Sequence, residues 1–121
     1  MMNMMNMMNK NTLLAVLLTL TAAGASANNN KVEIGKAAVE KCVACHGANF
    51  NETLDSSYPK LAGQHKDYLI QALKAYQRGV KGTAGRNNAI MAGQVQDLSN
   101  EQIEAIATYL NSLPTTLVVK K

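Results

Sequence analysis

The chain has 121 residues, and its 12 lysines and arginines outnumber its 8 aspartates and glutamates, giving a formal net charge of +4 at pH 7. The positive charges form no cluster, and no nucleic-acid recognition motif accompanies them. These features argue against a nucleic-acid-binding protein.

Residues 1–27 have the pattern of a secretory signal peptide. One positive charge, Lys10, precedes an apolar stretch over Leu13–Ala23, and the small residues that follow suit cleavage after Ala27. The apolar stretch is shorter than the roughly 20 residues that a membrane-spanning helix needs, so a retained anchor is the less favoured alternative. We therefore expect residues 1–27 to be removed and residues 28–121 to form one exported domain, since the remaining length is too short for two.

Apolar periodicity predicts two helices in the first half of this domain. The first covers Val32–Cys45, and its apolar face consists of Val32, Gly35, Ala38, Val39 and Cys42. The second covers His65–Arg78, and its apolar stripe consists of Tyr68, Leu69, Ala72, Leu73 and Tyr76. We expect Gly79 to end this second helix.

A third helix has the clearest start signal in the chain. Ser99 can cap it, Gln102 completes a capping box, and Leu98 can pack on Ile103 as a hydrophobic staple. Pro114 stops the helix. The residues that should face inward are Ile103, Ile106, Ala107, Leu110 and Leu113.

Two stretches, Gly47–Gln64 and Gly79–Asp97, show no regular period and are long for connections in so small a domain. Connections of that length usually serve a function. No segment between the helices has a convincing strand pattern. The sequence therefore predicts an all-α fold with three main helices and long loops.

Both cysteines lie in the segment Cys42-Val43-Ala44-Cys45-His46, which is the pattern of a c-type haem attachment site. The two thiols can add to the vinyl groups of a porphyrin, and the imidazole of His46 can bind its iron. On a helix these three side chains share one face. Two alternatives remain open: a zinc site that recruits His65, although adjacent Cys and His residues are unusual for zinc, and a redox-active dithiol.

Met91 is the candidate for the opposite axial position on the iron. The other six of the seven methionines lie within the first eight residues, which the predicted cleavage removes. Its neighbourhood, Asn87–Gln94, shows no helical period, and we expect a loop that presents the sulfur to iron. A core methionine is the alternative role for Met91. His65 is the only rival ligand, and we expect it to lie on the surface.

Four segments together resemble a small bacterial class I cytochrome c, and they are closest to one domain of the two-haem periplasmic carriers. These segments are Val39–Gly47, Tyr58–Gln64, Met91–Gly93 and the Tyr109–Leu110 pair, and the likeness covers residues 31–114. The single attachment motif means that this chain is expected to hold one haem.

The resemblance implies a site built from particular residues. Cys42 and Cys45 would hold one haem c by thioether bonds, with His46 and Met91 as the axial ligands of its iron. The carbonyl of Pro59 would accept a hydrogen bond from the ligand imidazole and fix its orientation. The resemblance also implies that Gly35 and Tyr109 meet where the first and last helices cross, and that Phe50 and the tyrosines are candidates to line the pocket.

The function that follows is electron transfer in the periplasm, by cycling of one iron between its ferric and ferrous states. Two axial ligands leave no open position for a substrate, and no catalytic triad or carboxylate pair is evident, so we do not expect an enzyme. The expected partners are redox proteins: a cytochrome reductase or dehydrogenase as donor, and a terminal oxidase or reductase as acceptor. The alternatives are a haem-bearing subunit of a larger oxidoreductase, or a haem-free zinc or dithiol module.

Overall fold

The structure is a computed structural model that describes residues 26–117. The predicted signal peptide, residues 1–27, lies almost wholly outside the described residues and stays a prediction. The chain divides into two compact units, Met1–Asn30 and Lys31–Lys121. Every feature of the candidate site lies in the second unit.

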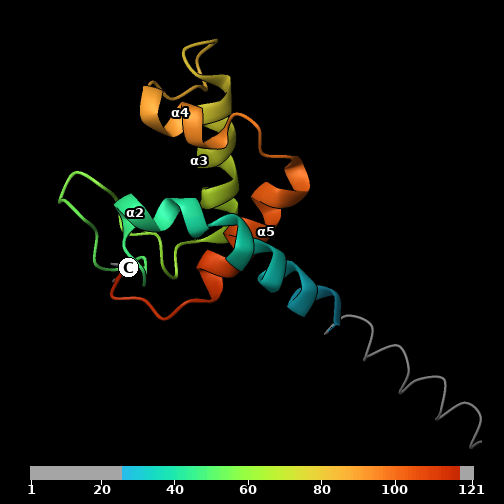
Figure 1. Cartoon of the computed structure of the whole chain (residues 1–121). Helices are drawn as coiled ribbons and strands as arrows, with labels where there is room; N and C mark the ends of the chain where they lie inside the picture. Colours follow the sequence, from blue (N-terminus) through green and yellow to red (C-terminus); the bar gives the residue numbers. More distant parts are fainter. Residues whose placement is uncertain (1–25, 118–121) are drawn as a thin grey trace, which may run out of the picture. The chain divides into compact units, whose positions relative to one another are not determined.

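The described residues are helical and contain no strand (Figure 1). Residues 26–38 form the first helix. It is followed by a short 3₁₀ helix, η1 (Glu40–Cys42), and by α2 (Val43–His46), α3 (Lys66–Arg78), α4 (Ala89–Val95) and α5 (Asn100–Ser112). The prediction of an all-α fold is confirmed. None of the described helices is both long enough and apolar enough to cross a membrane.

The prediction of one continuous helix over Val32–Cys45 is wrong, because the helix breaks at Val39. Val39 has φ −89° and ψ −1°. The amide of Cys42 donates to the carbonyl oxygen of Val39 at 2.8 Å, a bond between residues three apart as in a 3₁₀ helix. Side chains three apart stay aligned in a 3₁₀ turn. The apolar spacing of Val39, Cys42 and Cys45 therefore persists through the break, and periodicity alone could not reveal it.

The second and third predicted helices agree with the structure to within one or two residues. α3 is followed directly by Gly79, whose positive φ of 58° is a backbone conformation that glycine adopts without strain. α5 begins with the predicted capping box, in which Ser99 and Gln102 each accept the backbone N–H of the other. Its inward face supplies five of the eleven buried hydrophobic residues among those described: Ile103, Ala105, Ile106, Ala107 and Leu110.

Gly35 is the point of closest approach between the first helix and α5. A Cβ at this position would overlap the carbonyl oxygen of Ala105 and would lie 2.8 Å from Cβ of Tyr109. Glycine is required here because the two backbones leave no room for a side chain. The predicted meeting of Gly35 and Tyr109 is confirmed.

Phe50 belongs to the core and does not line the candidate site, so that prediction is wrong. Its side chain is 1% exposed and packs edge-on against Tyr109, with ring centroids 6.4 Å apart. Its φ of 57° is unusual for a bulky residue. The carbonyl of Phe50 accepts the amides of Leu61 and Ala62, which fixes the first long loop against the core.

The second long connection contains α4, which the sequence analysis missed. Met91 lies on this helix and not on a loop. Asn88 caps the helix by accepting the amide of Met91 at 2.9 Å, and α4 packs mainly against α3, beside its C-terminal half in Figure 1. The signal that could have revealed α4 is an asparagine cap followed by apolar residues at helical spacing, Met91, Val95 and Leu98.

Candidate functional site

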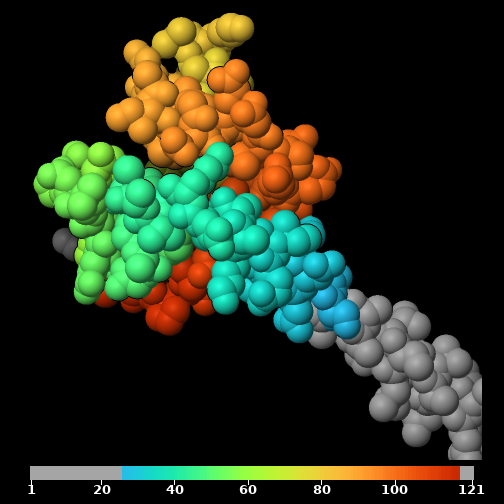
Figure 2. Space-filling view, in the orientation of Figure 1, coloured from blue at the N-terminus to red at the C-terminus, as the bar shows by residue number. Residues whose placement is uncertain are grey.

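A cavity of about 510 Å³ lies between the attachment segment, α3, α4 and α5, and Cys42, Cys45, His46 and Met91 all line it. This volume is in the range of about 300–1,000 Å³ that is usual for small-molecule and cofactor sites. Apolar side chains from α3 and α5, among them Leu69, Leu73, Ile106 and Leu110, form much of its wall. In Figure 2 the orange surface of α4 lies against the green surface that includes the attachment segment, with a hollow between them.

His46 is buried at one wall of the cavity, with 5% of its surface exposed. Its Nδ1 lies 2.9 Å from the carbonyl oxygen of Pro59. Because a carbonyl can only accept, Nδ1 carries the proton, and the neutral ring has its lone pair on Nε2. The hydrogen bond therefore selects the tautomer in which Nε2 can bind a metal. The ring of Tyr58 packs edge-on against His46, at 6.1 Å between centroids.

Cys42 closes η1, and Cys45 lies one turn further along in α2. Both are half-buried free thiols. Burial raises the pKa of Cys42, and the nearby Lys41 ammonium opposes that rise only in part. Burial therefore disfavours the thiolate form of the free Cys42 side chain.

The structure assembles neither a zinc site that includes His65 nor a haem site with His65 as axial ligand. His65 is exposed at the N-terminal cap of α3 and does not line the cavity. Within residues 26–117 no three His, Cys, Asp or Glu side chains come together as metal ligands would. The proposed zinc site with His65 therefore lacks its geometry. Met91, which is half-buried on α4, shares the cavity with His46.

The charged groups on the cavity wall are all positive. Lys41, Lys60 and Arg86 line it, and no aspartate or glutamate is among the described residues that do. A cavity with apolar walls and cationic groups suits a flat, apolar ligand that carries anionic substituents. Haem, with its two propionates, has this character.

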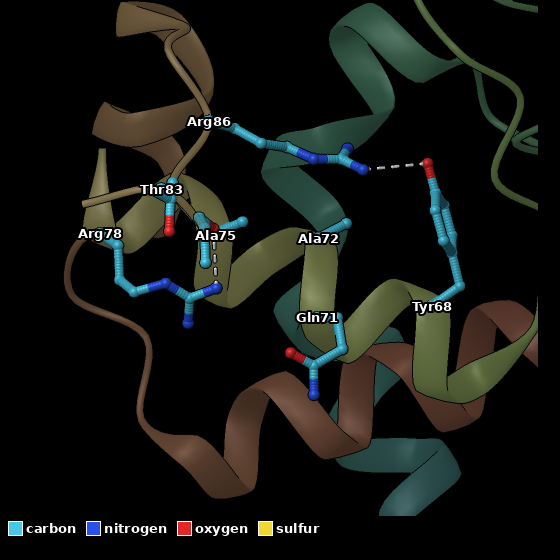
Figure 3. Close-up of a pocket in the computed structure, with 9 residues that line it drawn as sticks. Tyr68, Gln71, Ala72, Ala75, Arg78, Thr83 and Arg86 are labelled. Carbon is cyan, nitrogen blue, oxygen red and sulfur yellow. Dashed lines mark hydrogen bonds between the residues drawn. The ribbon is translucent and has the colours of Figure 1, made fainter. Parts of the chain in front are cut away.

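Arg86 is held in place by Tyr68 and Tyr76, two of the tyrosines that the sequence analysis named as candidates to line the pocket, and both do line the cavity. Its guanidinium lies 5.5 Å from the ring centroid of Tyr68 and 5.4 Å from that of Tyr76. Its Nη2 also donates to Tyr68 Oη at 3.2 Å, the hydrogen bond drawn in Figure 3. The hydrogen bond to Tyr68 raises the pKa of Arg86, so the group stays charged. No sequence signal links Arg86 to these tyrosines, because only the loop after α3 brings it to them.

Comparison with known proteins identifies the family. A family model described as Cytochrome c matches residues 32–114. Cytochrome c-554(548) of Halomonas halodenitrificans is 41% identical over 78 residues, which cover 64% of this chain and 90% of the relative. The chain belongs to the cytochrome c family. The predicted resemblance is confirmed, the family implies one covalently bound haem c, and the spacing of Cys42, Cys45 and His46 fits one haem.

Two further relatives are longer than this chain. Cytochrome c4 of Stutzerimonas stutzeri is 37% identical over 109 residues, which cover 87% of this chain and 51% of the relative. The thiosulfate dehydrogenase electron acceptor of Thiomonas intermedia is 40% identical over 72 residues, covering 60% of this chain and 31% of the relative. The chain thus spans about half and about a third of these two proteins. Cytochrome c domains transfer electrons, so the predicted electron-transfer function is confirmed for this domain.

Proposed function

We propose that this protein is a periplasmic electron carrier in which one haem c is held by Cys42 and Cys45, with His46 and Met91 as axial ligands. The observation that carries the proposal is the single cavity that these four side chains share. The haem iron supplies a one-electron couple between its ferric and ferrous states. The export pattern of residues 1–27 supports the periplasmic location.

The residues of the chain have distinct roles in this proposal. His46 offers Nε2 because Pro59 holds the proton on Nδ1, and the same hydrogen bond orients the ring. Met91 offers a soft thioether. Ligation by one histidine and one thioether stabilises the ferrous state more than ligation by two nitrogens does. The apolar walls from α3 and α5 would shield a bound haem from water, and His46 and Met91 would leave its iron no open position for a substrate. A carrier that performs no bond chemistry of its own follows from this arrangement.

For its partners we propose a dehydrogenase or cytochrome reductase as donor and a terminal oxidase or reductase as acceptor. The Thiomonas intermedia relative is named as an electron acceptor of thiosulfate dehydrogenase, which supports a dehydrogenase as donor. The same name also supports the alternative role of a haem-bearing partner within a larger oxidoreductase. Size-exclusion chromatography of native extracts distinguishes these roles, because a free carrier elutes near the mass of a single domain.

The ligand assignment is tested with Met91→Ala. We expect the variant to keep its covalent haem, which is detected by peroxidase staining of a denaturing gel. It should lose the red-region sulfur-to-iron absorption band, and its reduction potential should fall markedly because the thioether no longer favours the ferrous state.

His65→Ala is the matched control, since His65 is exposed and lies outside the cavity. It should keep both the band and the potential. If Met91→Ala behaves like the wild type, or if His65→Ala loses the band, the ligand assignment is wrong. If the wild-type band does not stain for haem and the native protein contains stoichiometric zinc, the haem-free alternative is supported instead.

A further inference from the structure

The helix that carries Met91 is weakly held by apolar packing. α4 has seven residues, and Val95 is the only one of them that is fully buried. Ile90, next to Met91, is 62% exposed, and Gly93 has no neighbour within contact distance of its missing side chain. A helix this short is marginal on its own. Something other than its own packing must therefore keep Met91 facing the cavity.

Polar side chains from two other elements hold the C-terminal end of α4. The ammonium of Lys41 donates to the carbonyl oxygen of Gln94 at 2.6 Å, across 53 positions of sequence. Nε2 of Gln77, on α3, donates to the carbonyl oxygens of Val95 and Leu98, each at 2.8 Å. The last carbonyls of a helix lack partners within it and carry partial negative charge, so these donors are well placed to stabilise the end.

Lys41 has a special place among these donors, because it precedes Cys42 directly. Its hydrogen bond joins the wall that attaches the haem to the wall that presents Met91. α4 packs mainly against α3. The Lys41 hydrogen bond to Gln94 connects α4 to the attachment segment as well. A charged donor on a carbonyl is stronger than a neutral one.

We propose that Lys41 and Gln77 are positioning residues that hold α4 so that Met91 stays on the haem iron. The inference rests on the proposed ligation by Met91. Without these hydrogen bonds α4 should spend more time away from the cavity, and the sixth position should be open more often. An added ligand then binds in proportion to the open fraction.

The test is an imidazole titration of the ferric holoprotein, followed through the loss of the sulfur-to-iron band. We expect Lys41→Met to lower the apparent Kd of imidazole by about tenfold, the effect of losing one charge-assisted hydrogen bond. Lys41→Arg keeps a charged donor and should restore a Kd close to that of the wild type. Lys36→Met is the matched control, because it removes the same charge from an exposed lysine away from the cavity.

Gln77 gives an independent pair of variants, in case Lys41→Met does not mature. Gln77→Met should lower the imidazole Kd about threefold or more, since two neutral hydrogen bonds are lost. Gln71→Met, on the same helix and also exposed, should leave it unchanged. Equal haem staining per chain shows that attachment is intact in each variant.

Two results would overturn the inference. If Lys41→Met matches Lys36→Met and Gln77→Met matches Gln71→Met within twofold, the hydrogen bonds do not hold Met91, while the proposed carrier function stands. If the wild type itself lacks the sulfur-to-iron band, the ligation by Met91 fails, and the inference fails with it.

Discussion

Single side chains set the chemistry of this cytochrome c domain, and Arg86 is the one that sequence reasoning missed. Its guanidinium contacts two tyrosine rings at the cavity wall, where it would be available to an anionic substituent of a bound haem. A fixed positive charge near the iron favours the ferrous form, which carries one positive charge fewer. Arg86 is therefore expected to raise the reduction potential.

Arg86→Met should lower the potential by an amount on the order of 50 mV, which is the general size of the effect of one unit charge at the edge of a redox site at an effective dielectric constant of about 20. A potentiometric titration of the holoprotein measures it. Lys81→Met is the control, since it removes the same charge from an exposed loop position that lines no part of the cavity. Equal potentials in the two variants would show that Arg86 has no particular influence on the iron.

The sequence predicted the attachment residues better than it predicted their surroundings. Cys42, Cys45 and His46 are adjacent in sequence, so a local motif was enough to identify them. Arg86, Tyr68 and Tyr76 meet only because a glycine-containing loop brings residue 86 back over α3. Such a meeting depends on tertiary structure, and no local pattern indicates it.

At the scale of helices, regular periodicity was reliable where a helix has one continuous apolar face. α3 and α5 were predicted nearly to the residue for this reason. The break at Val39 was missed because a 3₁₀ turn keeps a spacing of three. α4 was missed because its seven residues make only about two turns and include Gly93, so the spacing of Met91 and Val95 is too short a pattern to stand out without the Asn88 cap.

The crossing of the first helix over α5 gives a prediction about stability. Gly35→Ala should destabilise the holoprotein by about 1–3 kcal/mol, because the new methyl group meets the backbone of Ala105, which cannot move aside. Urea unfolding followed by circular dichroism measures the change.

Gly93→Ala is the matched control on another helix. Nothing lies within 4 Å of the added methyl group, and alanine is the better helix former by about 0.5–1 kcal/mol. Its stability should stay the same or rise slightly. If both variants lose stability equally, the loss at Gly35 does not come from the close crossing.

At the scale of the whole domain, the cofactor site and the hydrophobic core share residues. Leu69, Ile106 and Leu110 belong to the core cluster and also line the cavity. A domain of this size buries a modest core and is only marginally stable. The bound haem is therefore expected to complete the core as well as to carry electrons.

The double variant Cys42→Ala with Cys45→Ala tests this expectation. Without covalent attachment we expect no cooperative thermal unfolding transition, and a circular dichroism spectrum with reduced helix content. Met91→Ala serves as the comparison, because it retains the tethered haem and should still unfold cooperatively. A soluble, folded double variant without haem would show that the polypeptide completes its core unaided.

The acceptor of the His46 hydrogen bond is a main-chain oxygen of Pro59. Any amino acid has such an oxygen, so residue 59 contributes to the histidine through the course of its loop and not through a functional group. Pro59 restricts that course, because its ring fixes φ and it has no amide hydrogen to donate. Replacing Pro59 would therefore leave a carbonyl oxygen to accept the hydrogen bond, but it would let the orientation of the His46 imidazole vary more.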